Sequence, residues 1–179
     1  MSDERFIARL KTGDKEALRQ IYMQYKDMLL TVATSMLRDV HAAEDVLQDV
    51  FVSFASGVRS LDVRVNLKKY LMTCMVNRVR DRFRRKHPHL VDIDETDPPG
   101  SPMDGPEHSA MADEETKRLT QAMATLPDEQ RETIVLHLSA GLTFREIAEM
   151  QDISMSTVQG RYRYGLDKLR KALTGEQEP

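Results

Sequence analysis

The sequence predicts an all-α protein made of two small helical domains joined by a flexible acidic linker. Apolar residues recur at three- and four-residue steps through most of the chain, and no segment alternates with a period of two for long enough to form a strand. Five of the seven prolines fall between residues 88 and 106, in a stretch too poor in apolar residues to fold by itself. We therefore expect one domain over residues 1–87, a linker over 88–112 and a second domain over 113–174.

The composition fits two small cores. Of the 179 residues, 40% are hydrophobic, 31% are charged and 6% are aromatic, with no Trp, so each core should be small and aliphatic. One cysteine excludes an intrachain disulfide framework, and no apolar run has the length of a signal peptide or a membrane span. We expect a cytoplasmic protein without membrane insertion.

Three helices are expected in the first domain. Gly13 and Asp14 open an amphipathic helix of about six turns that ends near Leu37. A second helix carries its apolar residues, such as Val46 and Val50, opposite an acidic side and stops near Gly57. The third begins near Leu67 and continues into an arginine-rich block.

The second domain is also helical by its pattern. One helix ends at Leu126, and Pro127 starts another that Gly141 closes. Thr143 and Glu146 form the capping-box pattern at the start of a short helix, and Ser154 caps a final, longer helix. The turn between these last two helices is tight.

A short helix, a tight turn and a longer helix are typical of a helix-turn-helix, whose second helix enters the major groove of DNA. The apolar side chains of Ile147, Ala148, Ile153 and Val158 should fix the crossing. The residues left facing outward are Ser156, Gln159, Gly160, Arg163 and Tyr164. Gln can bond adenine and Arg can bond guanine at two points, while Arg161 or Lys168 would reach phosphate. An ordinary helical hairpin with solvated charges is the alternative.

The charge is distributed unevenly. The net charge of −3 divides into +6 over residues 1–91, −9 over 92–115 and zero over 116–179. The positive excess lies in the arginine-rich block at residues 78–86. A basic domain, an acidic linker and a neutral domain suggest contact with nucleic acid through the first domain.

Two sets of motifs carry a family resemblance. Residues 126–131 (LPDEQR), 141–148 (GLTFREIA), Ser156 to Val158 and Arg161 closely resemble region 4 of sigma factors of the extracytoplasmic-function (ECF) class within the sigma-70 family. Residues 43–51 (AEDVLQDVF) resemble region 2.2, and the stretch from Tyr70 to Arg85 resembles regions 2.3 and 2.4. The resemblance covers both helical regions in the family's order.

The resemblance implies a non-enzymatic transcription initiation factor with no cofactor or metal. Its partners would be core RNA polymerase, through the beta-prime and beta subunits, promoter DNA and an anti-sigma factor. The residues that it implies for binding core polymerase are Asp45, Gln48, Asp49 and Phe51. For Phe51, a place in the hydrophobic core is an equal alternative.

The resemblance also implies two DNA sites. A loop over residues 61–67 and Asn77 would capture a base flipped out at the minus-ten element, with cations beside them for phosphate. The residues of that site are Asn77, Arg78, Arg80, Arg84 and Lys86. The residues implied for the minus-35 element are Ser156, Gln159, Arg161, Arg163 and Tyr164. The chain departs from the family's pattern at the turn, where Asp152 replaces a common Gly, and at Tyr70, which replaces a Trp.

Two other functions are open at this point. A stand-alone DNA-binding regulator with a helical sensor or dimerisation domain would share the helix-turn-helix. The string from Asp92 to Thr96 matches the DxDxT motif of aspartate-nucleophile phosphatases, but that chemistry needs the end of a buried parallel strand, and none is expected here. His87, His89 and His108 have no cysteines at zinc spacing, so we expect no metal site.

Overall fold

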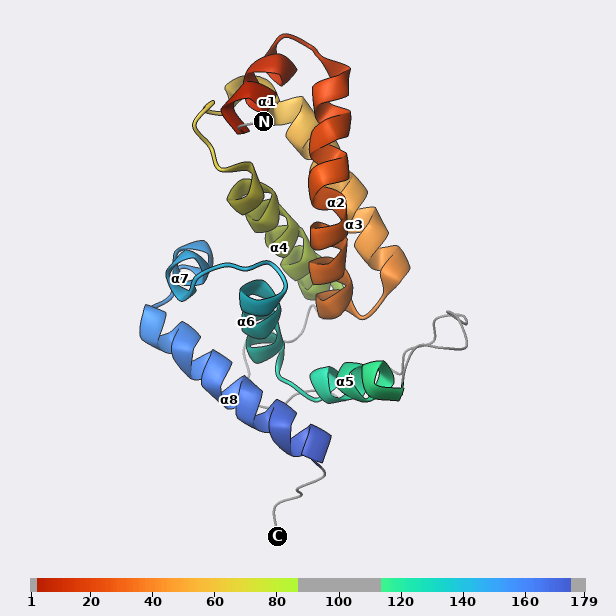
Figure 1. Ribbon diagram of the computed structural model, residues 1–179, viewed down its shortest axis with the longest axis vertical. Helices are drawn as coiled ribbons and strands as arrows, with labels where there is room; N and C mark the ends of the chain where they lie inside the picture. The colour runs from red at the N-terminus through yellow and green to blue at the C-terminus, as the bar shows by residue number, and fades with distance from the viewer. Residues whose placement is uncertain (1–2, 87–113, 175–179) are drawn as a thin grey trace. The chain divides into compact units, whose positions relative to one another are not determined.

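The computed structural model describes residues 3–86 and 114–174, which fall into two compact units within residues 1–92 and 93–179. Every regular element in these two ranges is a helix (Figure 1), so the predicted all-α class is confirmed. The predicted linker over 88–112, the DxDxT string and His87, His89 and His108 lie outside the described residues.

Unit 1, the part within residues 1–92, is built around three long helices. Its elements are α1 (Asp3–Lys11), α2 (Lys15–Leu37), α3 (Val40–Gly57), η1 (Val58–Ser60) and α4 (Leu67–Lys86). The helices α2, α3 and α4 pack against one another, and α1 covers one end of this bundle (Figure 1). Helix α1 was not expected from the sequence, although its Phe6, Ile7 and Leu10 are buried in the core.

Side chains at the helix ends fix the turns of unit 1. Asp14 accepts hydrogen bonds from the amides of Glu16 and Ala17 and so caps α2. Asp39 caps α3 by accepting from the amide of Ala42 at 2.9 Å. Between them Arg38 adopts a left-handed conformation, with φ of 55°, which turns the chain from α2 into α3.

Unit 2, the part within residues 93–179, has four helices, of which three pack around the long helix α8. These are α5 (Glu114–Ala124), α6 (Asp128–Leu138), α7 (Phe144–Gln151) and α8 (Met155–Thr174). Helix α8 contacts the other three (Figure 1). One close contact is at Gly165, which is buried and lies directly against Gln130 and Ile134 of α6.

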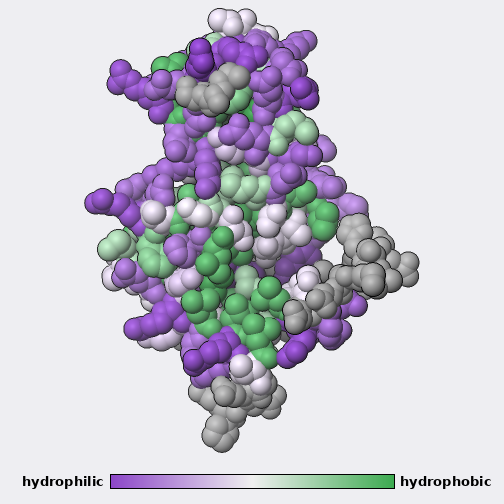
Figure 2. All heavy atoms as spheres, in the orientation of Figure 1, coloured by the Kyte–Doolittle hydropathy of each residue, from purple (hydrophilic) through white to green (hydrophobic). Residues whose placement is uncertain are grey.

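Unit 2 also exposes apolar side chains. Leu119 of α5 is 46% exposed and Leu138 of α6 is 60% exposed. On the face seen in Figure 2, hydrophobic residues gather over this unit around α6 and α8. Such exposure on a small unit is a common feature of surfaces that bind a protein partner.

Candidate functional site

Helix α3 has one buried and one exposed side. Val46, Leu47 and Val50 face the core, whereas Asp45, Gln48 and Asp49 are exposed on the opposite side. The helical period of 3.6 residues therefore gathers two carboxylates and an amide on one surface. We call the residues Asp45, Gln48, Asp49 and Val52 the outer face of α3.

Phe51 does not belong to the outer face of α3. Its side chain is 7% exposed and makes edge-on ring contacts with Tyr22, at 4.9 Å between centroids, and with Phe54, at 6.4 Å. Phe51 is therefore a core residue, the alternative given for it, and its side chain leaves little surface for the predicted polymerase contact. Val52, which was not among the predicted contacts, is 66% exposed and supplies the apolar part of this surface.

Helix α4 divides its cations between two sides. Asn77, Arg80 and Arg84 follow one another at three- and four-residue steps, with Asn77 and Arg84 exposed and Arg80 half-buried. Arg84 also binds Asp81 at 2.7 Å. Lys86 is the last residue of α4, and its side chain lies outside the described part of the chain.

Arg78 and Arg82 lie on the side of α4 that faces α3. The guanidinium of Arg78 donates to the hydroxyl of Ser53 at 2.6 Å, and that of Arg82 lies 3.5 Å from the carboxylate of Asp45. The arginines of residues 78–86 therefore do not share one side of α4. Arg78 lies on a different side of the helix from Asn77, Arg80 and Arg84.

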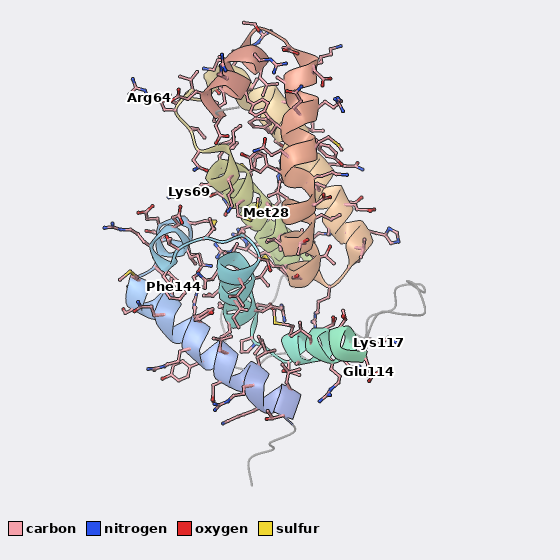
Figure 3. The ribbon with its side chains drawn as sticks, viewed as in Figure 1. Met28, Arg64, Lys69, Glu114, Lys117 and Phe144 are labelled. Atoms are coloured by element: carbon pink, nitrogen blue, oxygen red, sulfur yellow. The ribbon has the colours of Figure 1, made fainter. Side chains whose placement is uncertain are left out.

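The loop from Leu61 to Asn66 precedes α4 and is largely exposed. The carboxylate of Asp62 accepts from the amide of Arg64 at 2.9 Å, which gives the loop a local turn. Val63 is 38% exposed, and Arg64 points away from the helices (Figure 3). Asn66 caps α4 by accepting from the amide of Lys69 at 2.9 Å.

Tyr70 stands behind this loop, in the first turn of α4. Its ring lies 6.0 Å from that of Phe54, and the side chain is half-buried. Burial raises the pKa of the Tyr70 hydroxyl, so the residue stays neutral in the physiological range. The half-buried ring next to Phe54 contributes to the packing between α3 and α4.

The helix-turn-helix is formed by α7 and α8. Thr143 and Glu146 make both hydrogen bonds of the capping box at the start of α7. Asp152 ends α7 with φ of 53°, a left-handed conformation that Asp tolerates better than most residues, which explains how it replaces Gly. Ser154 caps α8 by accepting from the amide of Thr157 at 3.1 Å.

The first half of α8 presents a polar surface. Ser156, Gln159, Arg163 and Tyr164 are exposed, and Tyr164 is 57% exposed. The guanidinium of Arg163 lies 4.9 Å from the centre of the Tyr164 ring and donates to its hydroxyl at 3.2 Å. This surface, Ser156, Gln159, Arg163 and Tyr164, is the recognition face of α8.

Arg161 lies beside the recognition face but points inward. It is half-buried and donates to the side-chain oxygen of Gln151 at 3.2 Å. Gln151 in turn donates to Glu132 at 2.6 Å, and Glu132 is 6% exposed. This chain of bonds crosses from α8 through α7 to α6, so that Arg161 holds the two helices of the motif together.

No helix within residues 3–86 and 114–174 is long and apolar enough to cross a membrane. Across the same described ranges, His, Cys, Asp and Glu side chains form no group of three that would hold a metal ion.

The comparisons with known proteins agree with these two units. The family model for sigma-70 region 2 matches residues 21–88, and that for sigma-70 region 4 matches residues 122–171. The chain is 32% identical to the ECF RNA polymerase sigma factor SigW of Bacillus subtilis over 176 residues, which cover 93% of this chain and 94% of SigW. It is 29% identical to the RNA polymerase sigma factor CarQ of Myxococcus xanthus, over 96% of this chain and 97% of CarQ.

Two solved structures share the fold. One is CnrH in complex with the cytosolic domain of CnrY, with a TM-score of 0.71, 23% identity and coverage of 98% of this chain and 99% of that one. The other is the sigma factor RpoE in complex with the anti-sigma factor NepR from Bartonella quintana, with a TM-score of 0.71, 20% identity and coverage of 89% and 98%.

A region 2 unit followed by a region 4 helix-turn-helix defines a sigma-70-type initiation factor. The chain belongs to the ECF family of RNA polymerase sigma factors. It binds core RNA polymerase and directs promoter-specific transcription initiation, which removes the alternative of a stand-alone regulator.

Proposed function

We propose that the two units divide the work of initiation. Residues 1–87 bind core polymerase and melt the minus-ten element, residues 113–174 read the minus-35 element, and residues 88–112 join them. The protein works in the cytoplasm and without catalysis of its own. The observation that carries the proposal is that α3, α4 and α8 each present exposed polar residues, which supplies one surface for each contact that initiation requires.

Core polymerase binds the outer face of α3. Asp45 and Asp49 supply negative charge, Gln48 lies between them, and Val52 adds an apolar contact. An acidic helix face with one exposed valine suits a basic, partly apolar coiled coil on the polymerase. Phe51 contributes by holding α3 against α2 and not by touching the partner.

The minus-ten element binds the exposed loop over residues 61–66 and α4. Asn77 contacts the single strand, with Arg80 and Arg84 on the same side of the helix. Tyr70, in the first turn of α4, packs against Phe54 of α3. Melting requires groups that bind the single strand better than the duplex, and we assign the unpaired base to the exposed loop and its backbone to the nearby cations. Arg78, which donates to Ser53, and Lys86, whose side chain lies outside the described residues, remain predicted phosphate contacts.

The minus-35 element binds the recognition face of α8. Gln159 and Arg163 are placed to contact base edges, and Ser156 lies in the capped first turn, where backbone amides attract phosphate. Arg161 donates to Gln151 of α7, so it contributes to DNA binding indirectly, by fixing the position of α8.

An anti-sigma factor binds this protein and inhibits it when the genes that it transcribes are not required. Of the two solved structures that share the fold, RpoE is bound to the anti-sigma factor NepR, and CnrH is bound to the cytosolic domain of CnrY. Leu119 and Leu138, exposed on unit 2, offer apolar contacts for a protein partner.

The dock on α3 can be tested by reversing its charge. Replacing Asp45→Lys and Asp49→Lys together should weaken binding to core polymerase at least tenfold, about 1.4 kcal/mol, because like charges would then face each other. The control is Glu4→Lys with Asp27→Lys, which makes the same change in charge at exposed sites on α1 and α2. Retained core affinity in the first variant, or equal loss in both, would overturn the assignment of α3.

A further inference from the structure

The first described residue, Asp3, connects three helices of unit 1. One oxygen of its carboxylate accepts from the backbone amide of Leu67 at 2.9 Å, across 64 residues of sequence. The other oxygen accepts from the hydroxyl of Tyr25 at 3.2 Å. A single side chain on α1 therefore binds both α2 and the start of α4.

The amide of Leu67 is a group that needs a partner. It is the first of the amides at the start of α4, which have no acceptor within the helix. Asn66 satisfies the amide of Lys69, two residues further on, but not that of Leu67. Because Leu67 is fully buried, Asp3 provides a cap and a negative charge at a helix start that would otherwise be unsatisfied.

The other end of the exposed loop also depends on α1. The loop over residues 61–66 begins at η1, which packs against α1 and buries Val58. Both ends of the loop therefore rest on the N-terminal helix, whereas Asp62, Val63 and Arg64 between them are exposed.

Tyr25 keeps the carboxylate in place. Its side chain is 8% exposed, and burial together with the charge of Asp3 raises the pKa of Tyr25 to about 12. The hydroxyl therefore stays protonated and donates to Asp3 throughout the physiological range, which leaves the second carboxylate oxygen directed at α4.

We propose that Asp3 is a positioning residue for promoter melting, which holds the loop over residues 61–66 in the conformation that captures an unpaired base. This rests on the proposed function of that loop. A loop fixed at both ends before DNA arrives loses less conformational freedom when it binds, so the captured state is more stable. Helix α1 thereby belongs to the minus-ten machinery although it touches no DNA.

The experiment uses the polymerase holoenzyme assembled with variants of the full chain. Asp3→Ala should reduce binding to a single-stranded minus-ten oligonucleotide about tenfold, as expected for the loss of a hydrogen bond to a charged group. Opening of a duplex promoter, followed by 2-aminopurine fluorescence in the minus-ten element, should fall by a similar factor. Affinity for core polymerase should not change, because the outer face of α3 is untouched.

Asp3→Asn is the conservative variant. Its amide keeps an oxygen for Leu67 and an NH₂ group that can donate to the Tyr25 oxygen, so it should restore capture to within about threefold of the original. Glu4→Ala, at the exposed neighbour, is the matched control and should have no effect. Hydrogen exchange of the backbone amides of residues 58–70 in the free chain should be faster in Asp3→Ala. In Asp3→Asn it should return to the rate of the original chain.

The outcomes separate the two proposals. The double variant Val63→Ala and Arg64→Ala tests the loop itself, and if it leaves capture unchanged, both the loop's function and the role of Asp3 are overturned. If the loop variant loses capture but Asp3→Ala does not, only the inference about Asp3 fails. A loss of core affinity equal to the loss of capture in Asp3→Ala also overturns it, because Asp3 would then act on the whole unit.

Discussion

Two glycines in α8 offer a matched test of how closely this helix packs. A side-chain carbon added at Gly165 would lie 2.8 Å from the Cδ1 atom of Ile134 and 3.2 Å from the Cβ atom of Gln130, whereas one added at Gly160 meets nothing within 4 Å. Both positions are inside the helix, so Ala should gain about 1 kcal/mol of helix propensity at either. Only Gly165→Ala also overpacks the core, at a cost of about 1–3 kcal/mol.

The difference between the two alanine variants isolates the contact between α6 and α8. The equal gains in propensity cancel, so Gly165→Ala should leave unit 2 less stable than Gly160→Ala by about 1–3 kcal/mol. Hydrogen exchange of the α6 amides in the full chain measures this difference, because each 1.4 kcal/mol of opening free energy changes the exchange rate about tenfold. Equal exchange in the two variants would refute the close approach at Gly165.

Further predictions concern DNA reading and pH. Gln159→Ala and Arg163→Ala should each weaken use of a promoter by roughly 1–3 kcal/mol through its minus-35 element, measured as transcript yield on matched and altered sequences. If both leave minus-35 selectivity intact, the orientation of α8 on DNA is wrong. The folded form of unit 1 holds the Tyr25 proton more tightly than the unfolded form, since the pKa of Tyr25 is raised from 10.0 to about 12. The resulting stabilisation is complete below pH 10.0 and is lost as the pH rises towards about 12. The melting temperature should therefore fall over this pH range, and the fall should be smaller in Tyr25→Phe. An unchanged fall in Tyr25→Phe would contradict this explanation.

Local patterns in the sequence were enough to predict most helices and their caps. The capping box at Thr143 and Glu146 and the caps at Asp14 and Ser154 depend on residues three or fewer positions apart, and all three are present. The two helical regions also carry enough family motifs to indicate the sigma factor family. Helix α1 was not predicted, although its Phe6, Ile7 and Leu10 follow the helical spacing; at nine residues it is short, so this pattern spans little more than one turn.

The parts that sequence could not predict depend on neighbours distant in the chain. Whether an arginine of α4 faces solvent or α3 is decided by Ser53 and Asp45, which lie far from Arg78 and Arg82 in sequence. The bond from Asp3 to Leu67 has no local signature at all. Helical spacing could have shown that Phe51 does not lie on the outer face of α3. Phe51 is three residues from the apolar Phe54, which is buried, whereas Val52 is three residues from the charged Asp49, which is exposed.

Arg161 illustrates the same limit within the helix-turn-helix. Its place near the outward residues of α8 suggested a phosphate contact, but Gln151 of α7 draws its guanidinium inward, and Gln151 is held by the buried Glu132 of α6. Only the packing of three helices makes this visible.

Transcription reconstituted from purified components tests the central claim most directly. Core polymerase, this chain and a pool of genomic DNA fragments from its organism would be combined, and the 5′ ends of the transcripts sequenced. We expect start sites that require both the chain and core polymerase, that share two upstream elements, and that disappear with Asp45→Lys and Asp49→Lys. Specific DNA binding by the chain alone, with no start site that depends on it, would contradict the account.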